Sequence, residues 1–363
     1  MRGIIYRALP ESQTATVSIN PMQTGRNLTL KILLPLAIGI AVVVWLFGRE
    51  FSLSDLARVP WSGRTVWALS LALLAVAGRE FGLAWRFRVL TDGRLSPMAA
   101  LRVTMMCEFT SAITPTTAGG SAMSVWFMHR EGISGGRAGS VMLVTLLLDE
   151  GFMALAGPLV IVLLGSDALF GFSDGSGAAV DHGIRAAFWA VWGVTVVWTA
   201  VLFVAIILRP AAMSAVIRRV FSYRWLNRWQ KKMDGVAADL SEASRRLRGM
   251  GWRWWTKAAG ATALSWISRF LVVNALFAAF VPEAPQMLVL GRQAIVWLLL
   301  TVSPTPGGSG ISEWLFTTYY GDLVGDRSMT LVVAVMWRIL TYYIYLAAGA
   351  VVIPAWSRKR NLQ

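Results

Sequence analysis

The stretch TVSPTPGGSGISE, residues 301–313, interrupts a strongly apolar part of the chain with two prolines, three glycines and one carboxylate. Proline removes a backbone donor and blocks a helix interior, whereas glycine permits positive φ and close approach of the backbone. At membrane depth, such a break is tolerated only where protein or a water-filled cavity satisfies the freed backbone groups. The stretch TPTTAGGSA, residues 114–122, makes a similar break earlier in the chain. Two such breaks in corresponding places predict a transporter-like binding site.

The composition is typical of a protein that crosses a membrane several times. Its 363 residues are 56% hydrophobic, and the mean hydropathy is +0.58. The formal net charge of +15 does not indicate nucleic-acid binding, because the basic residues flank apolar spans and no nucleic-acid-binding motif is present. With one cysteine and two histidines in the chain, we expect no metal site, and we expect no other cofactor.

Apolar runs predict an all-α polytopic membrane protein with about six spanning helices. The runs lie at about 28–47, 65–90, 139–164, 187–208, 255–280 and 329–356. The expected organisation is a flexible cytoplasmic tail at 1–27, a first membrane repeat at 28–165, a second repeat at 187–356 and a basic tail at 357–363. The second repeat carries a basic, tryptophan-rich insertion at 210–257, for which we expect amphipathic helices on an anionic leaflet.

The distribution of charge predicts how the two breaks sit in the membrane. If each broken segment enters and leaves by the same face, the basic stretches fall on one side and the acidic loops fall on the other. The basic stretches are 1–31, 86–102, 210–257 and 357–360, and the acidic loops are 166–185 and 321–326. The positive-inside rule therefore predicts two re-entrant helical hairpins and two cytoplasmic termini in the cytoplasmic (inner) membrane. The order span, span, hairpin, span then occurs twice with opposite sense, as an inverted-topology repeat.

A constant offset of 189 residues relates the two halves. It maps Pro115 onto Pro304 at the breaks, and it maps Glu80 onto Arg269 and Asp149 onto Arg338. Opposite charges thus occupy equivalent positions. We expect Glu80 to lie near Arg269, or Asp149 near Arg338, across the two halves.

Charged residues at membrane depth are rare and costly, and by default they are functional. The candidate ligands of a lipid phosphate are Arg79, Arg269, Arg292 and Arg338. The candidate cavity carboxylates are Glu80, Glu108, Asp149, Glu150 and Glu313. These carboxylates would balance the empty cavity, or bind a proton or a cationic headgroup. The alternative is that the whole set forms structural ion pairs. Arg86 belongs to the segment WRFR, residues 85–88, which we interpret as an interfacial cluster.

The breaks also have two interpretations. They can end half-helices at the cavity, so that backbone amides face an anion, or they can be tight-packing kinks. The candidate residues of the first break are Pro115, Thr116, Gly119, Gly120 and Ser121. Those of the second break are Pro304, Thr305, Pro306, Gly307, Gly308, Ser309 and Gly310.

These motifs resemble a known family. The stretch FTSAITPTTAGGS (109–121), the later REGI (130–133) and LDE (148–150), and SPTPGGSGISE (303–313) followed by RILTY (338–342) are similar to the lysylphosphatidylglycerol synthase transmembrane family, also described as flippase-like. The resemblance implies an integral membrane domain associated with moving aminoacylated phosphatidylglycerol in fused members and with polyprenyl-linked sugars in others. The chain ends soon after its last expected span, so lysyl transfer by this chain is not expected.

We therefore expect a lipid translocase that moves an anionic phospholipid or a polyprenyl-phosphate-linked lipid. No G-x-x-x-x-G-K-[ST] motif is present, so the movement would be facilitated or ion-coupled. One alternative is a membrane-embedded glycosyltransferase, or another enzyme that uses a polyprenyl-phosphate lipid, with Glu50 and Asp55 as its candidate acids in the first outer loop. Another is a scaffold for a lipid-modifying enzyme. The expected partners are membrane lipids and such an enzyme, and no nucleic acid.

Overall fold

A computed structural model describes residues 61–114, 117–171, 178–223, 227–303, 305–308 and 310–360, and all regular secondary structure in these ranges is helical. The expected tail at 1–27, the first expected span at 28–47 and the last residues of the basic tail lie outside the described residues. So do Glu50 and Asp55, and the break residues Pro115, Thr116, Pro304 and Ser309.

Five helices in the described part are long and apolar enough to cross a membrane. They are Gly63–Leu90, Gly135–Leu164, Asp181–Leu208, Trp252–Phe280 and Met329–Ile353. They overlap the five expected spans that fall within the described residues. The chain is therefore an all-helical, multi-pass membrane protein.

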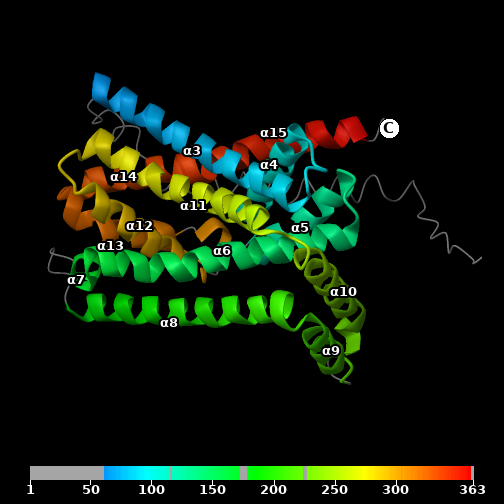
Figure 1. Cartoon of the computed structure of the whole chain (residues 1–363). Coiled ribbons are helices and arrows are strands. Elements are labelled where there is room, and N and C mark those ends of the chain that lie inside the picture. Colours follow the sequence, from blue (N-terminus) through cyan, green and yellow to red (C-terminus); the bar gives the residue numbers. More distant parts are fainter. Residues whose placement is uncertain are drawn as a thin grey trace, which may run out of the picture.

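In the labels of Figure 1, the first two of these spans are α3 (Gly63–Leu90) and α6 (Gly135–Leu164), and the fourth is α11 (Trp252–Phe280). The third consists of α8 (Ala178–Phe203) and a π-helical turn, Val204–Leu208. The fifth joins α14 (Arg327–Arg338) to α15 (Ile344–Arg360) through a second π-helical turn, Ile339–Tyr343. The short helix α7 (Ser166–Phe170) connects α6 to the α8 region.

Local sequence explains where these helices begin and end. Ser62 caps α3 by accepting a hydrogen bond from the backbone of Thr65 at 3.2 Å. Ser96 caps the next helix in the same way, and Pro97 occupies its first turn, where a missing amide hydrogen costs nothing. Gly165 ends α6 with a φ of 82°, a value that side-chain-bearing residues rarely adopt.

Two pairs of short helices flank the breaks. The first pair is α4 (Pro97–Ile113) and α5 (Thr117–Arg130), and the second is α12 (Gln286–Leu300) and α13 (Ile311–Val324). Each has 14 to 17 residues, so each is at most about 26 Å long, against about 30 Å for the hydrocarbon core. Figure 1 shows the first pair at the end of the bundle near the C-terminus and the second pair at the opposite end.

The two halves meet where α3 packs along α11 (Figure 1). Small residues make this contact close, because a Cβ atom on Gly82 would lie 2.9 Å from the backbone nitrogen of Ser265 and 3.0 Å from the carbonyl oxygen of Ala261. Close approach through small residues is the usual basis of helix association in membranes, where hydrophobic burial between helices gives little driving force. This packing brings the charged residues of α3 beside those of α11.

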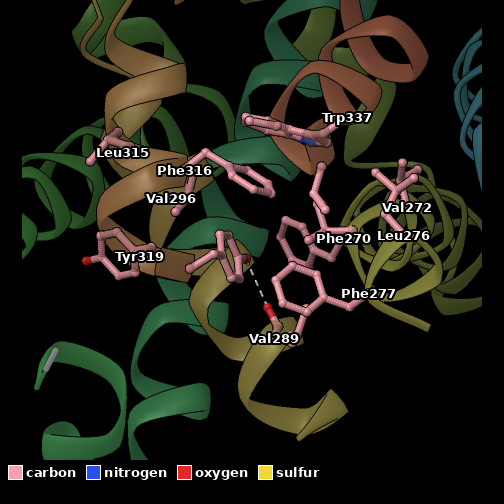
Figure 2. Packing of buried hydrophobic residues seen from close by; sticks show 14 of the residues in the cluster. Phe270, Val272, Leu276, Phe277, Val289, Val296, Leu315, Phe316, Tyr319 and Trp337 are labelled. Carbon is pink, nitrogen blue, oxygen red and sulfur yellow. Dashed lines mark hydrogen bonds between the residues drawn. The ribbon is translucent and has the colours of Figure 1, made fainter. Parts of the chain in front are cut away.

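Aromatic packing fills the region between α11, α12, α13 and α14. Figure 2 shows Phe270, Phe277, Phe316 and Trp337 in this cluster. The rings of Phe316 and Trp337 stack with their centroids 5.1 Å apart. The dashed line marks the hydrogen bond that the Tyr320 hydroxyl donates to the Val289 carbonyl at 3.1 Å. This cluster forms one of two buried cores, and the other packs mainly residues of the first half.

The basic insertion folds into helices, as expected. It contains α9 (Pro210–Phe221), a 3-10 turn (Asn227–Trp229) and α10 (Gln230–Leu247), and it extends beyond one end of the bundle in Figure 1. The buried face of α10 packs against α6 and α9. Asp92, just after α3, binds Arg246 of α10 at 2.9 Å and Arg137 of α6 at 2.6 Å, so this carboxylate ties the insertion to the bundle.

Candidate functional site

One cavity of about 320 Å³ lies between the two halves and receives residues from both breaks. The first break contributes Thr114 and Gly120. The second break and its approach contribute Thr301, Ser303, Thr305, Gly307 and Gly308. The chain's two interruptions therefore meet at one polar space.

The cavity is lined by charged, hydroxyl and aromatic groups. Its charged lining consists of Arg86, Arg269, Arg338, Glu108, Asp149 and Glu150. Its hydroxyl lining outside the breaks consists of Thr104, Ser111, Ser124, Thr145, Ser265, Thr341, Tyr342 and Tyr345. Apolar side chains, among them Leu83, Met142 and Met153, complete the wall, so the cavity places polar groups for a headgroup within a largely apolar surface.

Arg269, from α11, presents its charge to this cavity without a tight partner. Its Nη2 lies 3.8 Å from Oε2 of Glu108, which is beyond hydrogen-bonding distance. The guanidinium carbon lies 4.7 Å from the ring centroid of Trp266 and 4.4 Å from that of Trp297. Among the described residues, the Arg269 guanidinium donates no hydrogen bond within the protein. Two indole rings therefore position a cation whose donors remain available.

Glu108, from α4, connects Arg269 to a second arginine. Arg79 of α3 binds Oε2 of Glu108, and its other terminal nitrogen binds Glu80 at 2.6 Å. The guanidinium of Arg79 also lies 4.7 Å from the ring of Tyr345. Arg79 and Glu80 are buried behind the cavity and do not line it.

Asp149, from α6, is bound by a residue that sequence reasoning placed elsewhere. Arg86 binds both of its carboxylate oxygens, with Nη2 to Oδ2 at 3.1 Å, and Trp266 donates from its indole nitrogen to Oδ1 at 2.8 Å. The Arg86 side chain is buried and lines the cavity, a role that the sequence interpretation did not give it. It lies seven residues after Arg79, about two helical turns along the same face of α3, and this spacing is the signal that could have identified it.

Arg338 holds the second break in shape. Its Nε lies 2.8 Å from Oε1 of Glu313, its Nη1 donates to the carbonyl of Gly307 at 2.9 Å, and its guanidinium lies over Tyr342 at 4.2 Å. Glu313 in turn accepts a hydrogen bond from the amide of Gly310 at 2.6 Å. The amides of Gly308 and Gly310 are thus satisfied within the chain, the former by Thr305 at 3.0 Å.

Comparison with known proteins shows the family of the chain. The family model described as the lysylphosphatidylglycerol synthase TM region matches residues 32–349, which include the cavity and both breaks. The chain belongs to this family. It is 24% identical over 333 residues to a UPF0104 membrane protein of Archaeoglobus fulgidus, with 86% of this chain and 94% of that protein covered. No solved structure matches the chain.

The direct pairs expected from the 189-residue offset are corrected by the structure of this lysylphosphatidylglycerol synthase transmembrane family member. Glu80 binds Arg79, and Asp149 binds Arg86. The halves are nevertheless linked through polar groups. Glu108 reaches Arg269, and the Tyr342 hydroxyl donates to the carbonyl of Ala112 at 3.1 Å.

Arg292 lies away from the cavity of this family member. Its guanidinium binds both oxygens of Asp322, with Nη2 to Oδ2 at 2.9 Å, and donates to the carbonyls of Tyr319 and Ala168. These contacts join α12 to α13 and α7 at one end of the bundle. Its role as a phosphate ligand has no support from its position.

The remaining candidates are Glu150 and the glycines and serine of the first break, and they lie in different surroundings. Glu150 lines the cavity, is half-buried, and makes no ion pair among the described residues. Gly120 is part of a close helix contact, because a Cβ there would lie 1.9 Å from Oγ of Ser111. Gly119 and Ser121 fall in the first turns of α5. The first break is therefore a packing kink at Gly120 as well as a boundary of the cavity.

Proposed function

We propose that this chain is a translocase that moves a lipid with an anionic phosphate headgroup, an anionic phospholipid or a polyprenyl-phosphate-linked lipid, across the cytoplasmic membrane. The proposal rests on the environment of the Arg269 guanidinium. It lines the cavity between the breaks, two indole rings hold it, and its hydrogen-bond donors have no partner among the described residues.

The other arginines support this assignment by contrast. Arg79, Arg86 and Arg338 each donate hydrogen bonds to carboxylates or carbonyls of the protein. A guanidinium that is already bound in this way offers few donors to a ligand. A phosphate takes two parallel hydrogen bonds from an arginine fork, and Arg269 is the cavity arginine with that capacity. Hydroxyl groups on the cavity wall would take the remaining phosphate oxygens.

We further propose that the two helix–break–helix pairs are re-entrant hairpins of an inverted repeat, with both termini cytoplasmic. Three observations support this topology. The pairs lie at opposite ends of the bundle (Figure 1), their helices are shorter than the hydrocarbon core, and their breaks line one cavity. The equivalent spans α3 and α11 also pack against each other. Such a repeat places the binding site near the midplane of the bilayer.

The topology is tested by the accessibility of single cysteines to a membrane-impermeant thiol reagent. The native Cys107 is first replaced by serine. Cysteine at Asp326, an exposed position after α13, should react from outside intact cells, whereas cysteine at Arg245 on α10 should react only after the cells are opened. Labelling of both sites from outside would overturn the hairpin arrangement.

The activity is tested in proteoliposomes that contain a fluorescently labelled lipid and an impermeant reductant. Wild-type protein should expose the inner-leaflet label of at least one anionic lipid, phosphatidylglycerol or a polyprenyl phosphate. Arg269→Lys keeps the charge but loses the fork, so the rate should fall at least about tenfold if binding loses ~1.4 kcal/mol. Arg253→Lys, at an exposed position on the same helix, is the matched control.

The competing function is an enzyme that uses a polyprenyl-phosphate lipid. The half-buried carboxylate of Glu150 favours it, because a carboxylate without an ion-pair partner at the cavity wall can act as a general base. If wild-type vesicles move no anionic lipid while the purified protein consumes a polyprenyl-phosphate sugar, the enzyme replaces the translocase. In that case Glu150→Gln should abolish the consumption.

A further inference from the structure

Glu108 has an unusual position among the cavity carboxylates, because it contacts arginines from both halves of the chain. Its Oε2 binds Arg79 of α3 and lies 3.8 Å from Nη2 of Arg269 of α11. The first contact is a hydrogen-bonded ion pair, and the second is too long for a hydrogen bond. Glu108 is therefore hydrogen-bonded to Arg79, whereas it interacts with Arg269 only through charge.

We propose that Glu108 is an internal counter-ion, which neutralises Arg269 while the cavity is empty and gives it up when a lipid phosphate binds. This inference rests on the proposed function and specifies how the same site exchanges its occupant. A phosphate would sit where the donors of Arg269 are directed and would form the hydrogen bonds that Glu108 does not. Glu108 would compete with it through charge alone.

Each carboxylate and each arginine of this network keeps an oppositely charged neighbour in both states. In the empty cavity, an arginine at membrane depth with no nearby anion would be strongly unfavourable, and Glu108 supplies that anion. When a phosphate arrives, Glu108 keeps its contact with Arg79, so it is not left as an isolated buried charge. Arg79 is also bound by Glu80, so the pair is part of a larger network.

This arrangement serves movement rather than tight binding. A transported headgroup must bind well enough to enter the site and weakly enough to leave it. A neighbouring carboxylate lowers the affinity of Arg269 for an anion and takes its place as the anion departs. Removing the carboxylate should therefore strengthen binding and slow release.

A purely structural role for Glu108 predicts the opposite sign. If the contact between Glu108 and Arg269 only holds the halves together, its loss loosens the cavity and weakens both binding and transport. The direction of the change in affinity thus separates the two roles. An increase in affinity combined with a loss of rate is not expected from structural damage.

The test measures equilibrium binding of radiolabelled dodecyl phosphate to the purified full-length chain in a maltoside detergent, with translocation in proteoliposomes as the second readout. Glu108→Gln should bind the probe about tenfold more tightly than wild type, equivalent to ~1.4 kcal/mol, and should translocate lipid more slowly. Glu108→Asp keeps the competing charge and should lose most of this gain. Glu242→Gln on α10, away from the cavity, is the control and should match wild type in both assays.

The outcomes distinguish failure of the counter-ion role from failure of the proposed function. Equal or weaker binding by Glu108→Gln, with a wild type that binds, overturns the counter-ion and leaves the proposed function standing. Failure of the wild type to bind the probe or move any anionic lipid overturns the proposed function and the counter-ion with it. The double variant Arg269→Gln/Glu108→Gln should lose the gain, and retention of the gain overturns the assignment of Arg269.

If Glu108→Gln does not accumulate in the membrane, the variant Arg79→Gln/Glu80→Gln/Glu108→Gln replaces it. Arg79 also binds Glu80, so all three residues are replaced together, and no member of this buried network keeps a charge without its partner. The same increase in affinity for dodecyl phosphate is expected there. A decrease in that variant overturns the proposal.

Discussion

Trp266 contacts two oppositely charged residues of the cavity wall, since its indole nitrogen donates to Asp149 at 2.8 Å while its ring centroid lies 4.7 Å from the guanidinium carbon of Arg269. The indole therefore fixes a carboxylate of α6 relative to an arginine of α11. Its neighbour Trp297 faces the same arginine, but its indole nitrogen has no hydrogen-bond partner among the described residues. The two tryptophans form a matched pair for testing the polar contact separately from the ring.

Trp266→Phe keeps an aromatic ring beside Arg269 but removes the hydrogen bond to Asp149. We expect a loss of stability of about 1.5–3 kcal/mol, because the bond joins a donor to a charged acceptor. Trp297→Phe removes no such bond and should cost clearly less. Chemical or thermal unfolding of the two variants in the same detergent measures the difference, and equal destabilisation would contradict the importance of the bond to Asp149.

The pair of Arg86 and Asp149 should behave as a buried unit. Arg86→Gln or Asp149→Asn alone should destabilise the chain by about 3–5 kcal/mol, because each leaves one charge uncompensated. Replacing both residues, as Arg86→Met with Asp149→Leu, should recover much of that loss. The amount of folded protein in the membrane, measured by fluorescence-detected size exclusion, is the readout. A double variant that loses as much as the two single variants added together would show that the two residues act independently.

The conformation and packing at position 307 require glycine, whereas some other glycines of the chain can be replaced by alanine. Gly307 has a φ of 57°, and a Cβ there would lie 2.0 Å from Cε2 of Tyr342. Gly307→Ala should therefore cost about 1–3 kcal/mol and slow translocation, since it displaces the ring above Arg338. Gly260→Ala is the control, because that helical glycine has open space around it and alanine should gain about 0.5–1 kcal/mol. Melting temperatures of the two variants should therefore shift in opposite directions.

The carboxylate that ties the basic insertion to the bundle should make its docking sensitive to acid. Burial raises the pKa of Asp92, but a hydrogen bond from Arg246 and the charges of Arg246 and Arg137 outweigh this effect, so the pKa is lowered overall. A lowered pKa in the folded state stabilises the docked insertion above the unfolded pKa, which is about 3.9. That contribution is lost as the pH falls through the lowered value.

Limited proteolysis near the connection between α9 and α10 checks this. Cleavage of the wild type should accelerate as the pH falls below about 4. Asp92→Asn should be cleaved faster at neutral pH and should show a smaller dependence on acid. If the variant and the wild type have the same pH profile, Asp92 does not hold the insertion.

The parts of the fold that the sequence predicted are those with local signals. Apolar runs longer than the bilayer core identified the spans, and proline with glycine identified the breaks, because these residues change the backbone wherever they occur. The occurrence of two breaks predicted one shared binding site, and Gly307 and Gly120 do border one cavity. The placement of Arg79 and Arg269 within long apolar helices was also predictable from the runs that contain them.

The pairing of charges was not predictable in the same way. An offset along the chain relates equivalent positions, but an ion pair forms with whichever opposite charge the helix packing brings nearest. Asp149 meets Arg86 because α3 packs on α11 beside α6. Arg292 was interpreted as a phosphate ligand, yet its contacts depend on Asp322, thirty residues away in sequence. Only the packed structure distinguishes a bound arginine from one whose donors are available.

The glycine contact between α3 and α11 has a mechanical consequence. At Gly82 the two backbones approach so closely that one added carbon would touch Ser265 and Ala261, so rotating a bulkier residue of α3 into this place would drive the helices apart. In the proposed translocase, we therefore expect α3 and α11 to move together as one rigid unit. The short helices α4 and α12 pack on this pair, so any opening of the cavity would have to rearrange those contacts.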